Sequence, residues 1–92
     1  MKIDMMIVLY CNDPESQHIL GAFKKELESD IIPAIGTKIE EAVWHDPKEI
    51  KEVVINYARK RCHINFGLDE LAKEEQFATY KKMYESQGWK SV

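Results

Sequence analysis

The first third of the chain shows two different hydrophobic patterns, one after the other. Residues 2–10 are apolar without interruption from Met5 to Leu9, which is typical of a central strand buried on both faces of a sheet. Residues 14–29 instead carry apolar side chains at helical spacing, and Asp13 and Pro14 fit the N-cap and first position of a helix. The helical stripe consists of Ile19, Leu20, Phe23 and Leu27. The pattern predicts a strand followed by a helix that packs back onto it.

Residues 33–66 permit two interpretations. In the first they form a β-meander, with strands over 37–45, 52–57 and 62–66 joined by turns. Three consecutive β-branched residues at 53–55 favour this meander, because they lose side-chain freedom in a helix. Strand alternation then places one set of side chains on a common face: Val53, Ile55, Tyr57, Cys62, Ile64 and Phe66.

The second interpretation makes residues 47–62 a helix. Asp46 is its N-cap, Pro47 its first residue, and Glu49 completes a capping box. The apolar residues that follow fall on one helical stripe. The meander is preferred, because the segment 63–66 needs a neighbouring strand, but both interpretations stay open.

The last third of the chain predicts a second helix over about residues 69–87. Gly67 breaks the chain before it, Asp69 caps its start and Gly88 ends it. Leu68, Leu71 and Ala72 point to one side of this helix, and an aromatic stripe points to the other. Either the helix bends near residues 73–76, or the aromatic stripe contacts a partner. The candidate interaction residues are Phe77, Tyr80, Tyr84 and Trp89.

Together these elements predict a single α+β domain over residues 1–92, in the order βαβββα. One mixed or antiparallel sheet carries both helices on one face. A helix over residues 47–62 would change the order to βαβα, followed by a short strand and the last helix. The chain contains no repeat, low-complexity segment or linker that would mark a domain boundary.

Charge argues against a dedicated nucleic-acid-binding protein. The net charge is −3, whereas such proteins are usually strongly basic. Residues 1–46 carry four basic and nine acidic side chains, and residues 47–92 carry nine and seven. The candidate nucleic-acid contact is the basic turn Arg59, Lys60 and Arg61, which is more often a solvated turn than a binding site.

The two cysteines predict reduced thiols rather than a disulfide framework, and thus a cytoplasmic protein. Cys11 follows a predicted strand and precedes a predicted helix, so it is the best candidate nucleophile, with His18 or His45 as its base. Cys62 and His63 are adjacent and point to opposite faces of a strand, which disfavours a metal site. No cofactor motif and no apolar stretch of membrane-spanning length is present.

The sequence therefore favours a small, non-enzymatic cytoplasmic protein-interaction or regulatory module without a cofactor or metal. Its expected partner is a second copy of the chain or another protein, bound through the aromatic stripe of the last helix. Two alternatives remain: a nucleic-acid contact module that uses the basic turn, and a small thiol-dependent enzyme centred on Cys11.

Overall fold

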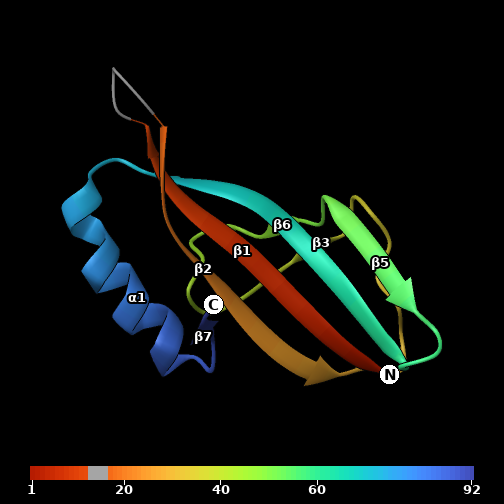
Figure 1. Cartoon of the computed structure of the whole chain (residues 1–92). Helices are drawn as coiled ribbons and strands as arrows, with labels where there is room; N and C mark the ends of the chain where they lie inside the picture. The colour runs from red at the N-terminus through yellow and green to blue at the C-terminus, as the bar shows by residue number, and fades with distance from the viewer. Residues whose placement is uncertain (13–16) are drawn as a thin grey trace.

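A five-stranded mixed sheet is the main element of the structure, a computed structural model that describes residues 1–12 and 17–92 (Figure 1). In spatial order its strands are β5 (Glu52–Asn56), β6 (Arg61–Leu71), β1 (Lys2–Asn12), β2 (Gln17–Glu28) and β7 (Lys90–Ser91). β1 is parallel to β6, and the other neighbouring pairs are antiparallel. The remaining elements are β3 (Lys38–Ile39), its partner β4 (Lys48–Glu49), the 3-10 turn η1 (Glu74–Gln76) and the helix α1 (Phe77–Ser86).

This architecture corrects the predicted fold class. Among the described residues, strands account for 51% and helical segments for 15%, with a single α-helix. The order βαβββα, with two helices packed on one sheet face, is therefore wrong. A mostly-β chain with one covering helix takes its place.

β2 replaces the helix predicted over residues 14–29. It pairs with β1 along its whole length, and the predicted cap residues Asp13 and Pro14 lie outside the described residues. Phe23 and Leu27 are four residues apart, so they fit a strand period of two as well as a helical turn. The central strand β1 needs hydrogen-bonding partners on both sides, and this tertiary demand overrides the helical propensity of β2.

The predicted central position of β1 is confirmed, but its predicted burial on both faces is wrong. Four alternate side chains point to the core and are at most 3% exposed: Ile3, Met5, Ile7 and Leu9. On the opposite face Met6 and Val8 are only partly buried. One face of the sheet is therefore packed and the other is open.

Residues 29–51, the crossing segment, return across the packed face between β2 and β5. Only Lys38 and Ile39 of the strand predicted over residues 37–45 are in β structure, paired with β4. Backbone hydrogen bonds from Gly36 N to Ile50 O and from Ile50 N to Thr37 O, both 2.9 Å, close this segment into a loop. Ile50 and Val43 anchor it in the core.

The hairpin of β5 and β6 confirms the second half of the predicted meander and rules out a helix over residues 47–62. Val53 lies opposite Ile64 and Ile55 opposite Cys62, as alternation predicted. Tyr57, however, belongs to the turn and is 75% exposed.

β6 also continues through the predicted start of the last helix. It follows β1 from Arg61 to Leu71, and Gly67 (φ 83°) accommodates a register shift instead of ending the strand. Leu68 and Leu71 are thus strand residues, and α1 begins only at Phe77. The two opposed stripes belong to two different elements, so the helix has no need to bend.

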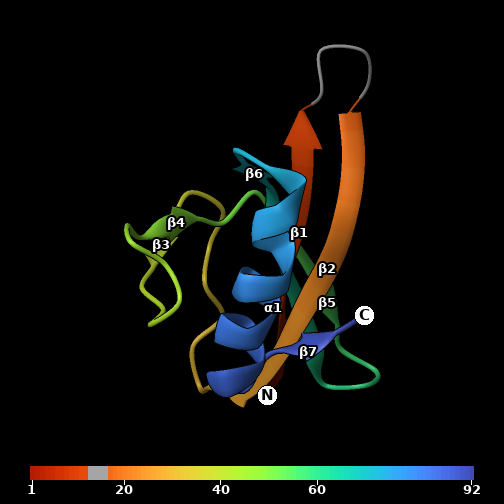
Figure 2. The same cartoon turned by 90° about the vertical axis from the view of Figure 1, so that its left-hand side faces the viewer.

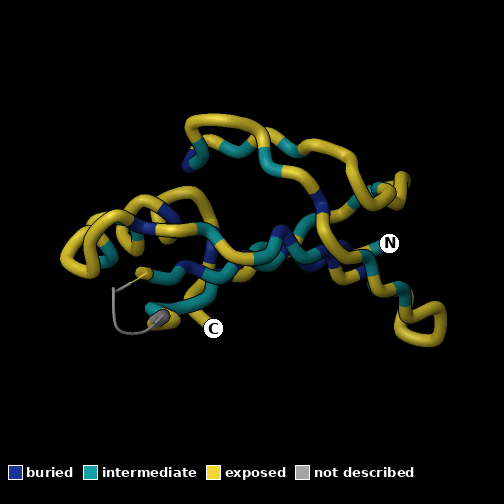
Figure 3. Tube along the Cα trace, turned by 90° about the horizontal axis from the view of Figure 1, so that it is seen from above, coloured by how far each residue is buried: buried dark blue, intermediate teal, exposed yellow. Residues whose placement is uncertain are grey.

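The molecule has two layers, as the two turned views show. α1 and the crossing segment lie on the same side of the sheet, in contact with its packed face (Figure 2). No described element covers the other face, which the viewer sees in Figure 1, and Figure 3 shows the largely exposed crossing segment along one side only. Among the described residues no helix is long and apolar enough to cross a bilayer.

Candidate functional site

An apolar groove lies between the sheet and the first part of the crossing segment. Its volume is about 610 Å³. The buried side chains of Ile3, Met5 and Ile64 form its floor, and Ser29, residues 31–34 and Ile39 form its wall. Such a volume and lining are typical of sites that hold an apolar ligand or side chains of a partner.

Three isoleucines beside the apolar groove are exposed. Ile31 is 75% exposed, Ile35 66% and Ile32 39%. Pro33 and the left-handed Gly36 (φ 90°) turn the backbone here, which keeps this short stretch from folding its side chains inward. Single exposed apolar residues are ordinary, but a cluster next to an apolar groove marks an interaction surface.

The rim of the apolar groove is acidic. Asp30 and Glu40 are exposed, and neither forms an ion pair with a described residue. Glu41 is instead partly buried, and it accepts hydrogen bonds from Lys25 Nζ (2.8 Å) and Trp89 Nε1 (3.0 Å).

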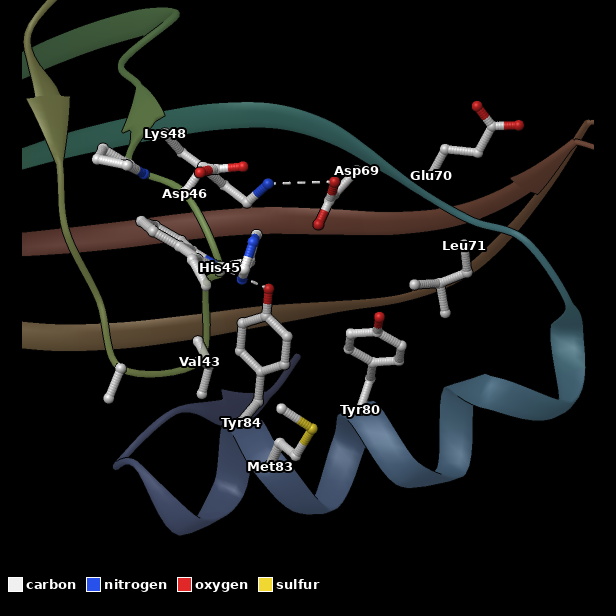
Figure 4. Close-up of a pocket in the computed structure, with 13 residues that line it drawn as sticks. Val43, His45, Asp46, Lys48, Asp69, Glu70, Leu71, Tyr80, Met83 and Tyr84 are labelled. Carbon is white, nitrogen blue, oxygen red and sulfur yellow. Dashed lines mark hydrogen bonds and ion pairs between the residues drawn. The ribbon is translucent and has the colours of Figure 1, made fainter.

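A second cavity, the polar cleft, lies between α1, the end of β6 and residues 42–48, and also measures about 610 Å³ (Figure 4). Trp44 Nε1 donates a 2.8 Å hydrogen bond to the Tyr84 hydroxyl. Lys48 Nζ lies 3.1 Å from Asp69 Oδ1 and 5.7 Å from the centre of the Trp44 ring. Tyr80 points into the cleft from α1.

Through these contacts the residues of the polar cleft connect α1, β6 and the crossing segment. Burial raises the pKa of Tyr84 to about 12, so its hydroxyl stays protonated at neutral pH. The ion pair of Lys48 and Asp69 joins β4 to β6. The Trp44–Tyr84 hydrogen bond and the Lys48–Asp69 ion pair thus attach residues 42–48 to α1 and β6.

An ionic cluster lies on the uncovered face of the sheet, where β1 and β6 begin. The carboxylate of Asp4, only 2% exposed, accepts hydrogen bonds from Arg61 Nη2 (2.9 Å) and Arg61 Nε (3.1 Å). His63 Nδ1 lies 3.3 Å and Lys24 Nζ 3.9 Å from the same carboxylate. Glu26 contacts Arg61 at 3.3 Å from the other side. The cluster therefore ties β1, β2 and β6 together.

Hydrogen bonding by Arg61, helped by the positive charge of Lys24, holds the pKa of Asp4 below its ordinary value of 3.8 despite burial. The carboxylate in turn raises the pKa of Arg61. Sequence analysis missed this cluster and the apolar groove. The signals were a lone acid directly before the apolar run of β1, and three isoleucines around a Pro-Ala pair in a short apolar stretch between polar residues.

The aromatic residues predicted to form an interface lie on the core side of α1 and β7. Tyr84 is 1% and Trp89 2% exposed, and Tyr84 stacks on Phe23 with ring centres 4.6 Å apart. Phe77 and Tyr80 are partly buried against the same cluster. Self-association stays a prediction, now without the exposed stripe that motivated it.

The basic turn is divided by the fold. Arg61 folds back onto Asp4 and Glu26, whereas Arg59 and Lys60 are exposed. Two solvated charges at the tip of a hairpin make a weak phosphate site compared with the basic surfaces typical of nucleic-acid-binding proteins.

Of the two candidate bases for Cys11, the fold brings only one close to it. Cys11 lies directly opposite His18 in the pairing of β1 with β2, so the predicted nucleophile and one of its candidate bases are neighbours. His45 lines the polar cleft, on a different part of the molecule. Cys62 is fully buried, and no group of three or more potential metal ligands occurs among the described residues.

Comparison with known proteins adds no family to this description. No family model matches the chain, and no curated protein or solved structure is significantly similar to it.

Proposed function

We propose that this chain is a small, non-enzymatic protein-interaction module that binds a segment of a partner protein in the apolar groove. The observation that carries the proposal is the exposure of Ile31, Ile32 and Ile35 beside an apolar cavity of about 610 Å³. Covering one such isoleucine contributes roughly 1–2 kcal/mol to binding after ordering costs. Three of them with the groove floor suffice for a specific, reversible complex.

The lining of the groove supports binding rather than catalysis. Its floor is aliphatic, and the hydroxyl of Ser29 is engaged within its own turn, where it donates to Ile31 O and accepts from Ile31 N. Catalysis needs a nucleophile and a base or acid held next to each other. The unpaired polar side chains of the lining, Thr37 and Glu40, are solvent-exposed, and neither is hydrogen-bonded to a second described side chain. We place this function in the cytoplasm, where both thiols stay reduced.

A peptide-display selection on the immobilised chain tests the proposal. Peptides enriched on the wild type should carry clustered aliphatic or aromatic residues and should bind the variant Ile31→Ser, Ile35→Ser at least tenfold more weakly. Ile19→Ser is the matched control, because Ile19 is 70% exposed on the other end of the sheet. Failure to enrich any peptide, or equal binding to the double variant, would disprove docking in the groove.

Light scattering of the same samples tests whether a second copy of the chain is the partner. Self-association that the groove variant abolishes would identify a homodimer built on this surface. A monomer at all concentrations would leave a different protein as the partner.

A second candidate function, thiol-dependent chemistry, is favoured by one observation, the cross-strand pairing of Cys11 with His18. An imidazole beside a thiol can accept its proton and activate it. If so, Cys11 should react with iodoacetamide clearly faster than a cysteine in a short peptide, and His18→Ala should remove the excess rate. Equal rates in the two proteins would eliminate this candidate.

A further inference from the structure

We propose that the segment bound in the apolar groove is amphipathic and basic, with lysine or arginine flanking its apolar residues. This inference rests on the proposed function and names the chemistry of the partner. It follows from the charges around the groove rather than from its apolar floor.

The acidic groups of the rim are available to a partner. Asp30 directly precedes Ile31, and Glu40 lines the groove between Ile39 and Glu41. Both carboxylates are exposed and have no ion-pair partner among the described residues. They therefore flank the apolar surface where a bound segment must pass.

The positive groups nearest the groove are largely neutralised within the chain. Lys25 is paired with Glu41 at 2.8 Å. The N-terminal amino group lies 3.6 Å from Glu28 and donates to the Ser29 carbonyl at 3.1 Å. Lys38, on the outer turn, is exposed and forms no ion pair with a described residue, because Glu49 opposite it in the pairing of β3 with β4 contacts Lys51 at 3.4 Å. One free lysine thus stands against the two free carboxylates of Asp30 and Glu40. The field over the groove is thus negative, and charge complementarity calls for a basic partner.

The same field argues against other apolar occupants. A fatty acid or an anionic bilayer would bring negative charge to Asp30 and Glu40 and would be repelled. An uncharged apolar segment would gain burial but no electrostatic attraction. An amphipathic segment with a basic flank gains both the burial of its apolar residues and the attraction to the two carboxylates. Such a segment docks its apolar face into the groove as a helix or as an extended chain.

The test uses three synthetic helical peptides of about four turns that share a leucine face and differ in the flanking residue, which is lysine, glutamine or glutamate. Affinities for the full chain are measured by fluorescence anisotropy at two salt concentrations. The lysine peptide should bind about tenfold more tightly than the glutamine peptide, and the glutamate peptide most weakly. The advantage of lysine should shrink as salt shortens the range of the charges.

Isosteric variants test whether the preference for the lysine peptide comes from the carboxylates of the rim. Asp30→Asn with Glu40→Gln should remove most of the preference for the lysine peptide and leave the glutamine peptide unchanged. Glu74→Gln with Glu75→Gln is the matched control, since it makes the same change of charge at exposed residues of η1. The control should retain the full preference.

Different failures have different meanings. The lysine and glutamine peptides could bind with equal affinity, and both could lose binding to the variant Ile31→Ser, Ile35→Ser. That result would overturn the inference that the bound segment is basic, and the groove would stand as the docking site. Binding of the lysine peptide that survives this double isoleucine variant would be adsorption to acidic surface and would overturn the inference. No binding of any peptide would overturn both the inference and the proposed function.

Discussion

Replacing Asp4 by asparagine tests how the central strands are held together. The substitution keeps the size of the side chain but puts an amide NH2 where the Arg61 guanidinium points its donor groups. A buried ion pair broken on one side typically costs 3–5 kcal/mol. Because Arg61 is 28% exposed and keeps its contact with Glu26, we expect a smaller loss of roughly 2–4 kcal/mol in the free energy of unfolding.

The pH dependence of this loss gives a second readout. The folded-state pKa of Asp4 is depressed below 3.8, so the carboxylate contributes stability that is fully present above that value. This contribution is lost as the pH falls through the folded-state pKa. The difference in stability between wild type and Asp4→Asn should therefore be constant near neutral pH and narrow in acid.

Urea unfolding followed by tryptophan fluorescence measures both effects, because Trp89 is buried and Trp44 partly buried in the folded state. Asp30→Asn is the control: the same substitution at an exposed aspartate should change stability by less than about 0.5 kcal/mol. A loss for Asp4→Asn no larger than that of the control, or one that persists unchanged in acid, would refute the argument that the buried carboxylate joins the strands.

Three further predictions concern the core. Tyr84→Phe keeps the ring but leaves Trp44 Nε1 without its acceptor, and should cost about 1 kcal/mol in urea unfolding; an unchanged midpoint would mean that water replaces the hydroxyl. Phe23→Ala, at a fully buried position, should cost about 3–5 kcal/mol in the same assay, and a loss below about 1 kcal/mol would contradict the packing. In a thiol assay with Ellman's reagent, Cys62 should react only on unfolding, since it is fully buried and burial raises its pKa, whereas the partly exposed Cys11 reacts in the folded state; two fast thiols would disprove this.

Local patterns sufficed where one period was unambiguous. The apolar run of β1 predicted a central strand, and the β-branched residues 53–55 predicted a hairpin with residues 62–66; both are present. In these stretches intrinsic propensity and burial favour the same structure, so no distant contact had to decide between alternatives.

The candidate sites depended on contacts that no local pattern contains. Asp4 and Arg61 are 57 residues apart and meet only because β6 lies parallel to β1. The apolar groove exists because residues 29–34 return over Ile3 and Ile64, which belong to different strands. Sequence spacing carries no information on such neighbours until the strand order is known.

What the sequence by itself determined about this protein is its central strand and its second hairpin. Tertiary structure alone decided that residues 17–28 are a strand, since their spacing fits both periods and only the hydrogen-bonding demand of β1 separates them. It also decided that β6 extends to Leu71, which assigned the two opposed stripes to different elements and turned Tyr84 and Trp89 into core. Backbone pairing is a non-local requirement, and here it overrode the local preference for helix.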